Sequence, residues 1–438
     1  MMPQQRLTVA AQRFGGTLLN PDCHFDAVSI NSRTINEGDL FVALVGERFD
    51  AHKFLPQAAA VASGLVVSEA DKSLPLPQWV VKDTTVALGQ IAELRRETFE
   101  GPVIAITGST GKTSVKELTA SILRHCGSVH ATAGNLNNHI GVPLTLLSMT
   151  ADTEIGIVEM GANHAKEIAM LCEIAHPNMG YITNFGKAHL EGFGSEEGVV
   201  KAKSELYDYL KANSGLIILN SEDAKQVAQV GTYDNVHTFS QSLETSLNVK
   251  LTATQPLLNV VLKNTTIKTN LVGAYNFCNV AAALTIGMYF KLSPLQLKNG
   301  IEAYIPANNR SQVIQQNSNE ILLDAYNANP SSMDVALENF KGIQNQHKLA
   351  ILGDMFELGT TTAKEHLAVV NQAILTKDCS FYFVGTHFFE QKTAHPKLLF
   401  FETFKDLQLR LEKSTISNTS ILIKGSRGME LERVLGLI

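Results

Sequence analysis

VIAITGSTGKTSVKELTASIL, residues 103–123, carries the strongest local signal in the chain. A short apolar run leads into two closely spaced glycines, Gly108 and Gly111, and then into a sequence that suits a helix. A strand, a glycine-rich turn and a helix that begins with Lys-Thr form the phosphate-binding arrangement called a P-loop, because backbone N–H groups and the helix N-terminus face the anion. We therefore expect a nucleotide to bind here.

The turn departs from the strict P-loop pattern, which would need glycine where the chain has Ile106, so only the shorter TGSTGKT matches. The alternative is a glycine turn before an ordinary helix, but the flanking strand and helix favour phosphate binding. ATP is the expected nucleotide, because the sequence has no NKxD motif for guanine. The residues expected to contact it here are Thr107, Gly108, Ser109, Thr110, Gly111, Lys112, Thr113 and Ser114.

Around this stretch, short and nearly continuous apolar runs alternate with helical patterns. Such runs are typical of strands covered on both faces, and the alternation predicts a parallel α/β sheet. At residues 247–271 the sequence pattern changes, and apolar and polar residues are interspersed in a way that predicts an inserted antiparallel element. Residues 274–290 predict a helix. The expected central strands are residues 103–107, 155–160, 180–184 and 215–219.

The two ends of the chain predict further domains. The first 80 or so residues contain short β-like runs separated by turns, and a second α/β alternation follows a polar linker at 308–311. The predicted fold class is therefore α/β with three domains. They are a small N-terminal α/β substrate domain at 1–82, a central P-loop domain with a mostly parallel sheet at 83–307, and a C-terminal Rossmann-like α/β domain at 308–438.

Composition excludes several other classes of protein. The 438 residues are 45% hydrophobic and 18% charged with a formal net charge of −6, so we expect a folded protein that does not bind nucleic acid. Five scattered cysteines favour neither a disulfide framework nor a CxxC metal site. The N-terminus resembles no export signal, and polar residues interrupt the uncharged run 269–290. We expect a cytoplasmic monomer without membrane insertion.

Several longer motifs resemble the central domain of the Mur ligases. In order and spacing they are TGSTGKTS at 107–114, GNLNNHIGVPLT at 134–145, EMGANHAKEI at 159–168, ITNFGKAHLEGFGS at 182–195, KAKSEL at 201–206 and GAYNFCNVAAALTIG at 273–287. The resemblance implies ATP-dependent formation of a peptide bond. In this chemistry the γ-phosphoryl group of ATP activates a carboxylate as an acyl phosphate, which an amine then attacks.

The flanking segments resemble one branch of that family. They are residues 30–54, 324–333, 352–359 and 422–434, and the branch adds D-alanyl-D-alanine to UDP-N-acetylmuramoyl-tripeptide for peptidoglycan precursor synthesis. A member that adds a diamino acid would be expected to carry DNPR, where this chain has YNANP. Other hypotheses are a different Mur-type amino-acid ligase, a folylpolyglutamate-type enzyme, a P-loop NTPase that switches a protein partner, and a non-catalytic UDP-sugar-binding protein.

Four residues are expected to carry the catalysis: Lys112, Glu159, His189 and Lys203. Glu159 ends an apolar strand, where it and Thr113 would hold Mg²⁺ beside the phosphates. The resemblance implies that His189 contacts a second Mg²⁺ and that Lys203, a position carbamylated in several members, supplies another metal ligand. The alternatives are that Glu159 is a surface glutamate, that His189 is a loop histidine without a metal, and that Lys203 is a solvated lysine of an amphipathic helix.

The resemblance also implies contacts with the rest of the nucleotide. Asn276 would lie near the adenine, whereas Asn279 is explained nearly as well by helix capping or by a polar seam under the inserted hairpin. Arg310 and Asp324 match positions that contact the phosphate and ribose once the third domain closes. The chain departs from its relatives around Arg310, where it has NNRSQV, and at Ala325, which replaces a common serine.

Substrate residues are expected from all three domains. Closure must then assemble the site, and we expect hinges near 82–84 and 306–310. In the third domain, the alternative to dipeptide binding is that NANP at 327–330 is a turn that ends a strand and that KGSR at 424–427 is an ordinary strand-to-helix loop. The residues matched to substrate binding are Ser32, Arg33, Gly46, Phe49, Asp50 and His52 for the UDP-sugar, Asn135 and Asn138 in the central domain, and Tyr326, Asn327, Asn329, Lys424 and Arg427 for the dipeptide.

Overall fold

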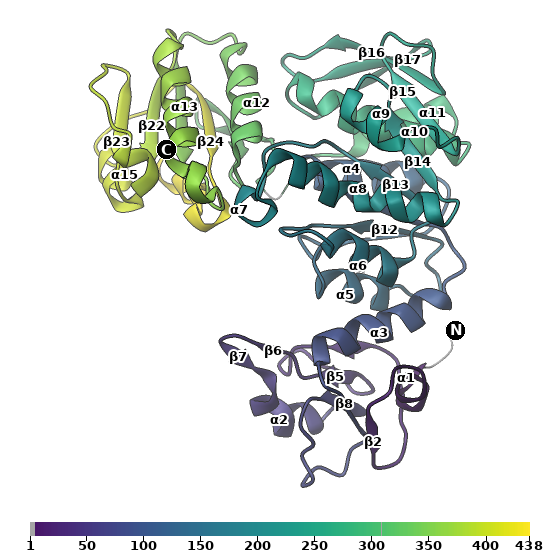
Figure 1. Cartoon of the computed structure of the whole chain (residues 1–438). Helices are drawn as coiled ribbons and strands as arrows, with labels where there is room; N and C mark the ends of the chain where they lie inside the picture. Colours follow the sequence, from purple (N-terminus) through teal and green to yellow (C-terminus); the bar gives the residue numbers. More distant parts are fainter. Residues whose placement is uncertain (1–4, 308) are drawn as a thin grey trace.

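Three larger β-sheets, of five, nine and six strands, follow one another along the chain and form three lobes (Figure 1). The structure is a computed structural model that describes residues 5–307 and 309–438. Residues 1–4 of the predicted first domain and position 308, which belongs to the predicted linker and hinge, lie outside the described residues. The α/β fold class is confirmed, whereas the domain limits stay predictions.

The first lobe is built on a five-stranded sheet with the order β2-β9-β8-β5-β4. Only β2 pairs antiparallel, and the other neighbours are parallel. The strands are β2 (Thr17–Leu19), β9 (Gln78–Val80), β8 (Gly64–Val67), β5 (Leu40–Val42) and β4 (Val28–Ser29), with the small pairs β1 (Gln5–Arg6) with β3 (His24–Phe25) and β6 (Val45–Gly46) with β7 (Phe49–Asp50). The helices are α1 (Leu7–Phe14), η1 (Ala51–Phe54) and α2 (Leu55–Ala59).

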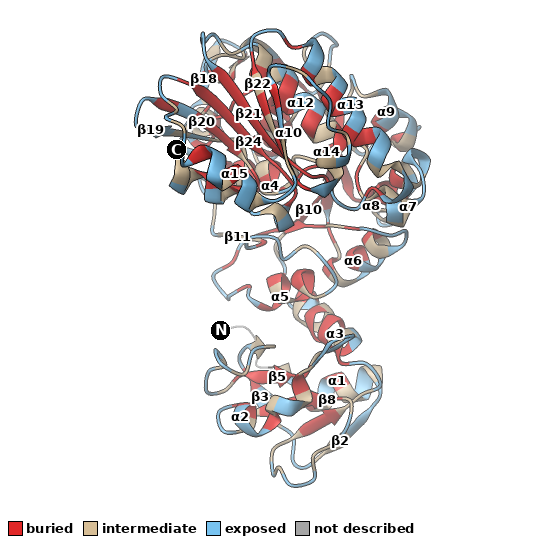
Figure 2. Cartoon of the chain, turned by 90° about the vertical axis from the view of Figure 1, so that its left-hand side faces the viewer, coloured by how far each residue is buried: buried red, intermediate tan, exposed pale blue. Residues whose placement is uncertain are grey.

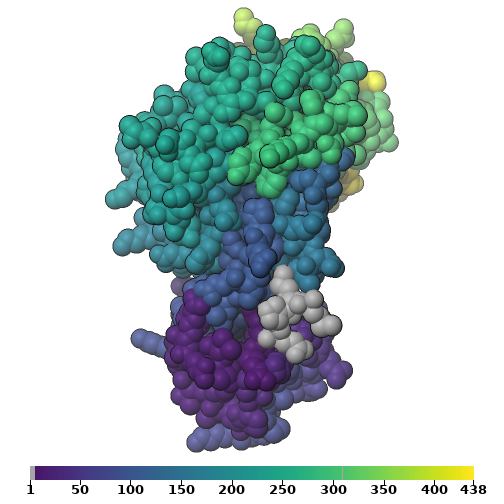
Figure 3. All heavy atoms as spheres, turned by 90° about the vertical axis from the view of Figure 1, so that its right-hand side faces the viewer, coloured from purple at the N-terminus to yellow at the C-terminus, as the bar shows by residue number. Residues whose placement is uncertain are grey.

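Helix α3 (Thr84–Glu97) joins the first lobe to the central one. Asp83 caps it by accepting bonds from the backbone N–H groups of Thr85 and Val86, and Arg13 of α1 forms ion pairs with Glu93 and Glu97 on its exposed face. Buried apolar residues on one side of the first-lobe sheet, among them Leu40 and Trp79, form one cluster with α3 and the central lobe, whereas those on the other side, among them Phe41, form a separate cluster. Figure 3 shows the first lobe beneath the central one in the space-filling view.

The central lobe contains a nine-stranded sheet. Its first seven strands in spatial order are parallel, and β17 and β18 then add antiparallel, which confirms the inserted antiparallel element. The order is β11 (Val129–Ala131), β12 (Ile155–Glu159), β10 (Val103–Thr107), β13 (Met179–Ile182), β14 (Leu216–Asn220), β15 (Val236–Ser240), β16 (Leu247–Ala253), β17 (Asn259–Leu262) and β18 (Thr265–Lys268).

Strand β10 is buried on both faces, as its continuous apolar sequence predicts. Ile104 and Ile106 point into the cluster shared with α4 and α10, whereas Val103 and Ala105 point into the cluster shared with α3 and α5. Because the side chains of a strand alternate between faces, one apolar run serves both clusters. The helices here are α4 (Lys112–Leu123), α5 (Gly141–Leu147), α6 (Glu167–Ala175), α7 (Leu190–Phe193), α8 (Glu196–Ala212), α9 (Ala224–Val230), η2 (Ala274–Asn276), α10 (Phe277–Tyr289) and α11 (Pro294–Ala303).

The third lobe has a six-stranded sheet that is parallel except for β19 at one edge. Figure 2 shows its buried strands between helices on both faces. The order is β19 (Gln312–Gln316), β20 (Asn319–Asp324), β24 (Ser420–Lys424), β21 (Lys348–Gly353), β22 (Ser380–Val384) and β23 (Leu398–Phe401). The helices are α12 (Pro330–Lys341), η3 (Gly359–Thr361), α13 (Thr362–Leu375), α14 (Thr386–Glu390), α15 (Phe404–Leu411), η4 (Arg427–Met429) and η5 (Leu431–Leu437).

No helix in the described part of the chain is long and apolar enough to cross a membrane.

Candidate active site

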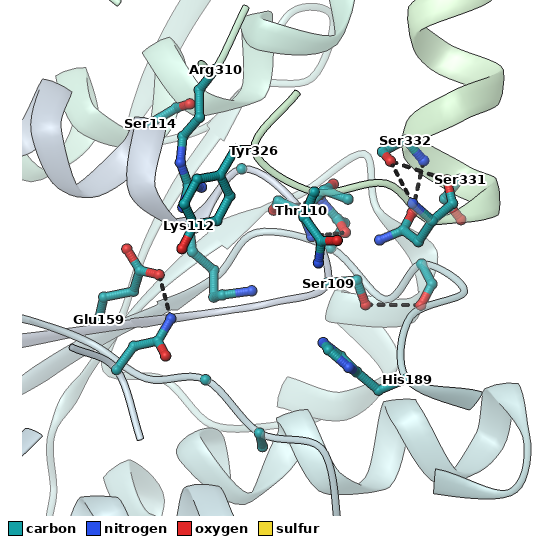
Figure 4. A pocket seen from close by; sticks show the side chains of 18 of the residues that line it. Ser109, Thr110, Lys112, Ser114, Glu159, His189, Arg310, Tyr326, Ser331 and Ser332 are labelled. Atoms are coloured by element: carbon teal, nitrogen blue, oxygen red, sulfur yellow. Dashed lines mark hydrogen bonds between the residues drawn. The ribbon is translucent and has the colours of Figure 1, made fainter. Parts of the chain in front are cut away.

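The central and third lobes face each other across a cavity of about 730 Å³ (Figure 4). It lies at the carboxyl ends of β10 and β12, the edge at which parallel α/β sheets bind ligands. Ser109, Lys112 and Glu159 line it from the central lobe, and Arg310 and Tyr326 line it from the third lobe. The structure therefore brings predicted residues that are far apart in the sequence to one cavity.

The turn after β10 adopts a conformation that two glycines make possible. Gly108 has φ +139°, and a Cβ there would collide with the Thr183 hydroxyl. Gly111 has φ +79°, and a Cβ would lie 2.6 Å from the Asn279 side-chain oxygen. Such backbone angles are costly for other residues. Lys112 Nζ donates to the Gly108 carbonyl at 2.7 Å, so its cation stays within the turn.

The charge on Lys112 is sensitive to its surroundings. Burial lowers the pKa of Lys112, Glu159 opposes this shift, and the positive charge of Arg310 adds to it. Two cations that share a cavity favour an anionic ligand, because its charge relieves their repulsion. A polyphosphate is an anion of that kind, and the backbone N–H groups at the start of α4 suit it as well.

Glu159 ends β12 and is almost fully buried beside the turn. One carboxylate oxygen accepts from the Thr113 hydroxyl at 2.7 Å, and the other accepts from Asn137 Nδ2 at 2.8 Å. The Glu159 N–H donates to the Thr132 hydroxyl, which fixes the backbone. A hydroxyl and a carboxylate in contact are hard oxygen ligands of the kind that Mg²⁺ binds, so this pair fits a magnesium ion.

Asn137 is the residue that the sequence prediction missed in this run. The predicted Asn135 and Asn138 also line the cavity, but Asn138 Oδ1 accepts from the N–H groups of Ile140 and Gly141 at the start of α5. The Asn137 carbonyl accepts from the Gly161 N–H at 2.7 Å. This bond ties the run to the segment after β12 and brings Asn137 to Glu159.

Lys203 is buried, not solvated. It lies on α8, its Nζ donates to the Ala162 carbonyl at 3.2 Å, and it sits 5.2 Å from the centre of the Phe193 ring. Burial, and to a smaller degree the charge of Lys112, lower the pKa of Lys203 to about 7, although Glu167 and Glu205 oppose the shift. A lysine with so low a pKa is partly neutral near pH 7, which is the form that reacts with CO₂.

His189 lies in the wall of the cavity, and its imidazole extends inward from the loop before α7 (Figure 4). Its ring meets the Phe193 ring edge-on, so His189 and Lys203 flank the same aromatic side chain. Its Nδ1 is 2.5 Å from a carboxylate oxygen of Glu357 in the third lobe. Within the described residues no three His, Cys, Asp or Glu side chains lie together as a group that could hold a metal ion.

The predicted nucleotide residues of the third lobe are brought together. The Arg310 guanidinium stacks 3.5 Å from the centre of the Tyr326 ring. Asp324 forms an ion pair with Lys424 at 2.6 Å and accepts from the Ser311 N–H at 3.1 Å. Because Lys424 is buried, its pairing with Asp324 compensates both charges and fixes the end of β20.

The other predicted residues divide into two groups. Asn276 and Asn279 both line the cavity, and the Asn276 side-chain oxygen accepts from Asn279 Nδ2 at 2.8 Å. Asn279 lies inside α10 and caps neither of its ends, so the prediction of a helix cap was wrong. Asn327 and Asn329 line the cavity, and the Asn329 side chain also caps α12. Arg427 lies outside the cavity lining and pairs with Glu432 at 2.5 Å.

The predicted UDP-sugar residues lie in the first lobe, outside the cavity lining. Phe49 on the hairpin β6-β7 is 56% exposed and stacks on Phe54. His52 contacts Asp50 through Nδ1 at 2.8 Å and accepts from the Ser68 N–H through Nε2. These bonds give the two residues a local structural role. The remaining members of the set are Ser32, which contacts Gln57, together with Arg33 and Gly46.

A loop after β13 connects the turn to the third lobe, and its role was missed from the sequence. The Ser109 N–H and hydroxyl donate to the carbonyls of Asn184 and Gly186. On the other side, the Lys187 N–H donates to the Ser331 hydroxyl at 2.9 Å, and Lys187 Nζ is 3.5 Å from Glu365. One loop therefore contacts both the phosphate-binding turn and α12 and α13.

Two family models match the chain. Residues 106–287 match the Mur ligase middle domain, and residues 309–427 match the Mur ligase glutamate ligase domain. UDP-N-acetylmuramoyl-tripeptide–D-alanyl-D-alanine ligase of Escherichia coli is 35% identical over 96% of this chain and 95% of its own length. The enzyme of the same name from Bacillus subtilis is 33% identical over 97% and 96%.

Solved structures give the same result. The chain resembles crystal structure I of MurF from Acinetobacter baumannii with a TM-score of 0.87 and 29% identity, covering 99% of both chains. It resembles MurF ligase from Thermotoga maritima in complex with ADP with a TM-score of 0.83 and 26% identity, covering 94% of this chain and 96% of the other. These likenesses extend over all three lobes.

Proposed function

Because the chain belongs to the Mur ligase family, we propose that its cavity joins D-alanyl-D-alanine to UDP-N-acetylmuramoyl-tripeptide. It is an ATP-dependent ligase of peptidoglycan synthesis. The products are UDP-N-acetylmuramoyl-pentapeptide, ADP and phosphate. The observation that carries the proposal is the single cavity in which a phosphate-binding turn, a Thr113–Glu159 pair and polar groups of the third lobe meet.

The chemistry follows from the poor reactivity of a carboxylate. An oxygen of the tripeptide's terminal carboxylate attacks the γ-phosphorus, ADP leaves, and an acyl phosphate forms. The amine of the dipeptide then attacks the acyl carbon, loses a proton, and phosphate leaves as the amide forms. Phosphoryl transfer depends on positioning and charge neutralisation, which the turn and its lysine supply.

The role of each phosphate-binding residue follows from its position. Lys112 and backbone N–H groups at the end of the turn and the start of α4 hold the β- and γ-phosphates, and the Lys112 cation offsets the charge that develops during transfer. Thr113 and Glu159 would hold Mg²⁺ through hard oxygen atoms. When bound there, the ion neutralises phosphate charge. Asn137 keeps the Glu159 carboxylate turned toward Thr113.

His189 and Lys203 act on the acceptor side of the γ-phosphate in this proposal. The buried amine of Lys203, with its low pKa, suits carbamate formation, which would convert a cation into an oxygen ligand for a second Mg²⁺. His189 would be the protein's nitrogen ligand to the same ion. Their common contact with Phe193 supports this pairing.

The remaining residues bind the substrates. Asn276 contacts the adenine, and Arg310 and Asp324 contact the phosphates and ribose. The UDP-sugar residues are Ser32, Arg33, Gly46, Phe49, Asp50 and His52, with Asn135 and Asn138 at the reacting end. The dipeptide residues are Tyr326, Asn327, Asn329, Lys424 and Arg427, of which Arg427 must turn from Glu432 to reach the cavity.

Closure of the lobes completes the site, because the UDP-sugar residues lie outside the cavity. We propose domains at 1–82, 83–307 and 308–438, with hinges near 82–84 and 306–310. The protein works as a cytoplasmic monomer. Small-angle scattering is expected to show a smaller radius of gyration with an ATP analogue and UDP-tripeptide, and identical profiles would contradict closure.

The test of the function is phosphate release from Mg²⁺-ATP, with the UDP-tripeptide and D-alanyl-D-alanine supplied separately and together. We expect release and a product of pentapeptide mass only when both are present. Phosphate release that is the same with and without the two substrates would instead indicate a P-loop NTPase. Product formation with an amino acid in place of the dipeptide would indicate a different Mur-type ligase.

A further inference from the structure

Two residues of the phosphate-binding turn, Ser109 and Thr110, are bonded to protein groups through atoms that a phosphate could use. The Ser109 N–H donates to the Asn184 carbonyl at 3.1 Å, and the Ser109 hydroxyl donates to the Gly186 carbonyl at 2.8 Å. The Thr110 N–H donates to Asn184 Oδ1 at 3.2 Å. The backbone N–H groups of both residues are therefore directed to Asn184.

The side chain of Asn184 contacts Thr110 through both ends of its amide. While Oδ1 accepts from the Thr110 N–H, Nδ2 donates to the Thr110 carbonyl at 3.1 Å and to the Thr110 hydroxyl at 2.9 Å. An asparagine offers one acceptor oxygen and two donor N–H groups, and all three are used here. One side chain thus satisfies every polar group of Thr110.

The segment that carries Asn184 is packed tightly against the turn. The Thr183 N–H donates to the Thr107 carbonyl at 2.9 Å, which extends the parallel pairing of β10 and β13. The Thr183 hydroxyl donates to the Thr110 carbonyl, and a Cβ at Gly108 would lie only 3.1 Å from the Asn184 nitrogen. The end of β13 therefore holds Asn184 at a fixed place beside the turn.

A second set of N–H groups is directed toward an anion. Gly111 is the residue before α4, and the first N–H groups of a helix have no acceptor within the helix. These groups, from Gly111 to Ser114, adjoin Thr113, whose hydroxyl donates to Glu159 at 2.7 Å. A phosphate on them lies next to the pair expected to hold Mg²⁺, whereas a phosphate bonded to Thr110 would be displaced along the turn.

We propose that Asn184 is a positioning residue that determines which N–H groups of the turn bind the phosphates. Its bonds keep the donors of Thr110 from the nucleotide, so the phosphates are held from Gly111 onward, in register with Thr113. Because phosphoryl transfer requires aligned reacting atoms, a displaced γ-phosphate slows transfer more than it weakens binding. The inference rests on the proposed phosphate binding by this turn.

The docked third lobe supports the same loop from its other side. The Lys187 N–H donates to the Ser331 hydroxyl of α12 at 2.9 Å. A Cβ at Gly186 would lie 3.0 Å from the Ser331 hydroxyl and 3.5 Å from Ser109 Cβ, so Gly186 fills the space between α12 and the turn. Asn184 is thus placed by β13 and by a loop that the third lobe contacts.

NMR of single backbone amides tests the inference without using activity. Threonine labelled at nitrogen, combined with serine labelled at its carbonyl carbon, selects the amides of Ser-Thr pairs, which occur at 109–110 and 414–415. Carbonyl-labelled lysine selects instead the Lys-Thr pairs at 112–113, 268–269 and 392–393. Threonine-to-serine substitutions at the other positions assign the signals. We expect Mg²⁺-ADP to shift the Thr113 signal strongly and the Thr110 signal little.

The variant Asn184→Ala releases the N–H and hydroxyl of Thr110, so we expect Mg²⁺-ADP to shift its Thr110 signal strongly. The matched control is Asn270→Ala, because the Asn270 side chain also donates to two carbonyls, those of Glu302 and Tyr304, and lies outside the cavity lining. We expect this control to keep the wild-type pattern. A wild-type Thr110 signal that moves as far as that of Thr113 would overturn the inference, and that result requires no variant.

Steady-state kinetics supply the second measurement, with UDP-tripeptide and D-alanyl-D-alanine at saturation. A misplacement of about 1 Å can reduce a rate by about 100-fold. We expect kcat of Asn184→Ala to be lower by about 10–100-fold, with KM for ATP within about threefold of the wild type. A kcat equal to that of Asn270→Ala, or a raised KM with unchanged kcat, would overturn the positioning role.

These outcomes are separate from failure of the proposed function. If Mg²⁺-ADP shifted neither Thr110 nor Thr113, phosphate binding by the turn would fail, and the inference would fail with it. A wild type that shows the expected shifts but forms no pentapeptide would contradict the ligase proposal and leave the role of Asn184 supported. Pentapeptide formation with equal shifts of Thr110 and Thr113 would contradict only that role.

Discussion

Replacing Gly111 with alanine perturbs the phosphate-binding turn at the position where its geometry is most demanding. The residue has φ +79°, and the added Cβ would lie 2.6 Å from Asn279 Oδ1. The Asn279 side chain can shift away, but it then loses its bond to Asn276 Oδ1. The substitution thus strains the backbone and disturbs the residue expected near the adenine.

The size of the effect follows from these two costs. A left-handed backbone costs an alanine roughly 1–2 kcal/mol. Loss of one hydrogen bond between neutral side chains adds about 1 kcal/mol. The variant turn relieves these costs by leaving the conformation that holds the phosphates, and binding must restore that conformation. Because each 1.4 kcal/mol is about tenfold in affinity, their sum of roughly 2–3 kcal/mol predicts nucleotide binding that is weaker by about 30–150-fold.

The assay is isothermal titration of Mg²⁺-ADP into the wild type and Gly111→Ala. The matched control is Gly231→Ala, because Gly231 has φ +64° with open space around its Cβ position and lies outside the cavity lining. We expect the control to lose stability but to bind ADP normally. Binding by Gly111→Ala within about threefold of the wild type would refute the claim that this turn conformation holds the phosphates.

Two further substitutions test the site and its support. Lys203→Ala is expected to depress ligation, with partial rescue by a short carboxylic acid if a carbamate forms there, and wild-type activity would exclude a role for Lys203. Burial lowers the pKa of His366, whose Nε2 accepts from the Met355 N–H, so the folded state resists its protonation. The unfolded state then binds more protons below about pH 6.5, and stability falls as the pH drops through that range. Calorimetry is expected to show that the stability of His366→Gln falls less steeply with decreasing pH than that of the wild type. Equal dependence of stability on pH in the two proteins would contradict a contribution from His366.

The sequence predicted the elements that act through local pattern. The phosphate-binding turn is contiguous, and Glu159 ends an apolar strand, so chain connectivity alone places both at the same sheet edge. The parallel strands were likewise predicted from continuous apolar runs, and the antiparallel insertion from the change of hydrophobic pattern at residues 247–271.

The burial of Lys203 could have been predicted from helical periodicity, but the lysine-rich composition of its helix pointed the other way. Its lysine-rich helix indicated a solvated residue, yet Val199, Ala202, Leu206 and Leu210 are buried at helical spacing, and position 203 falls on the same stripe. Helical periodicity therefore predicts its burial better than composition does.

Other parts of the site depend on tertiary contacts that no local pattern encodes. Three asparagines in one run have the same chemistry, and only the bond between the Asn137 carbonyl and Gly161 selects which one reaches Glu159. Glu357 contacts His189 from another lobe, so this contact depends on how the two lobes dock. Side-chain pairing also turns Arg427 toward Glu432.

The most direct test of the central claim follows one oxygen atom. UDP-tripeptide whose reacting carboxylate carries the heavy oxygen isotope is incubated with the enzyme, ATP and D-alanyl-D-alanine, and the released phosphate is analysed by mass spectrometry. Activation as an acyl phosphate predicts that one labelled oxygen leaves with each phosphate. Pentapeptide formed with unlabelled phosphate would contradict the account.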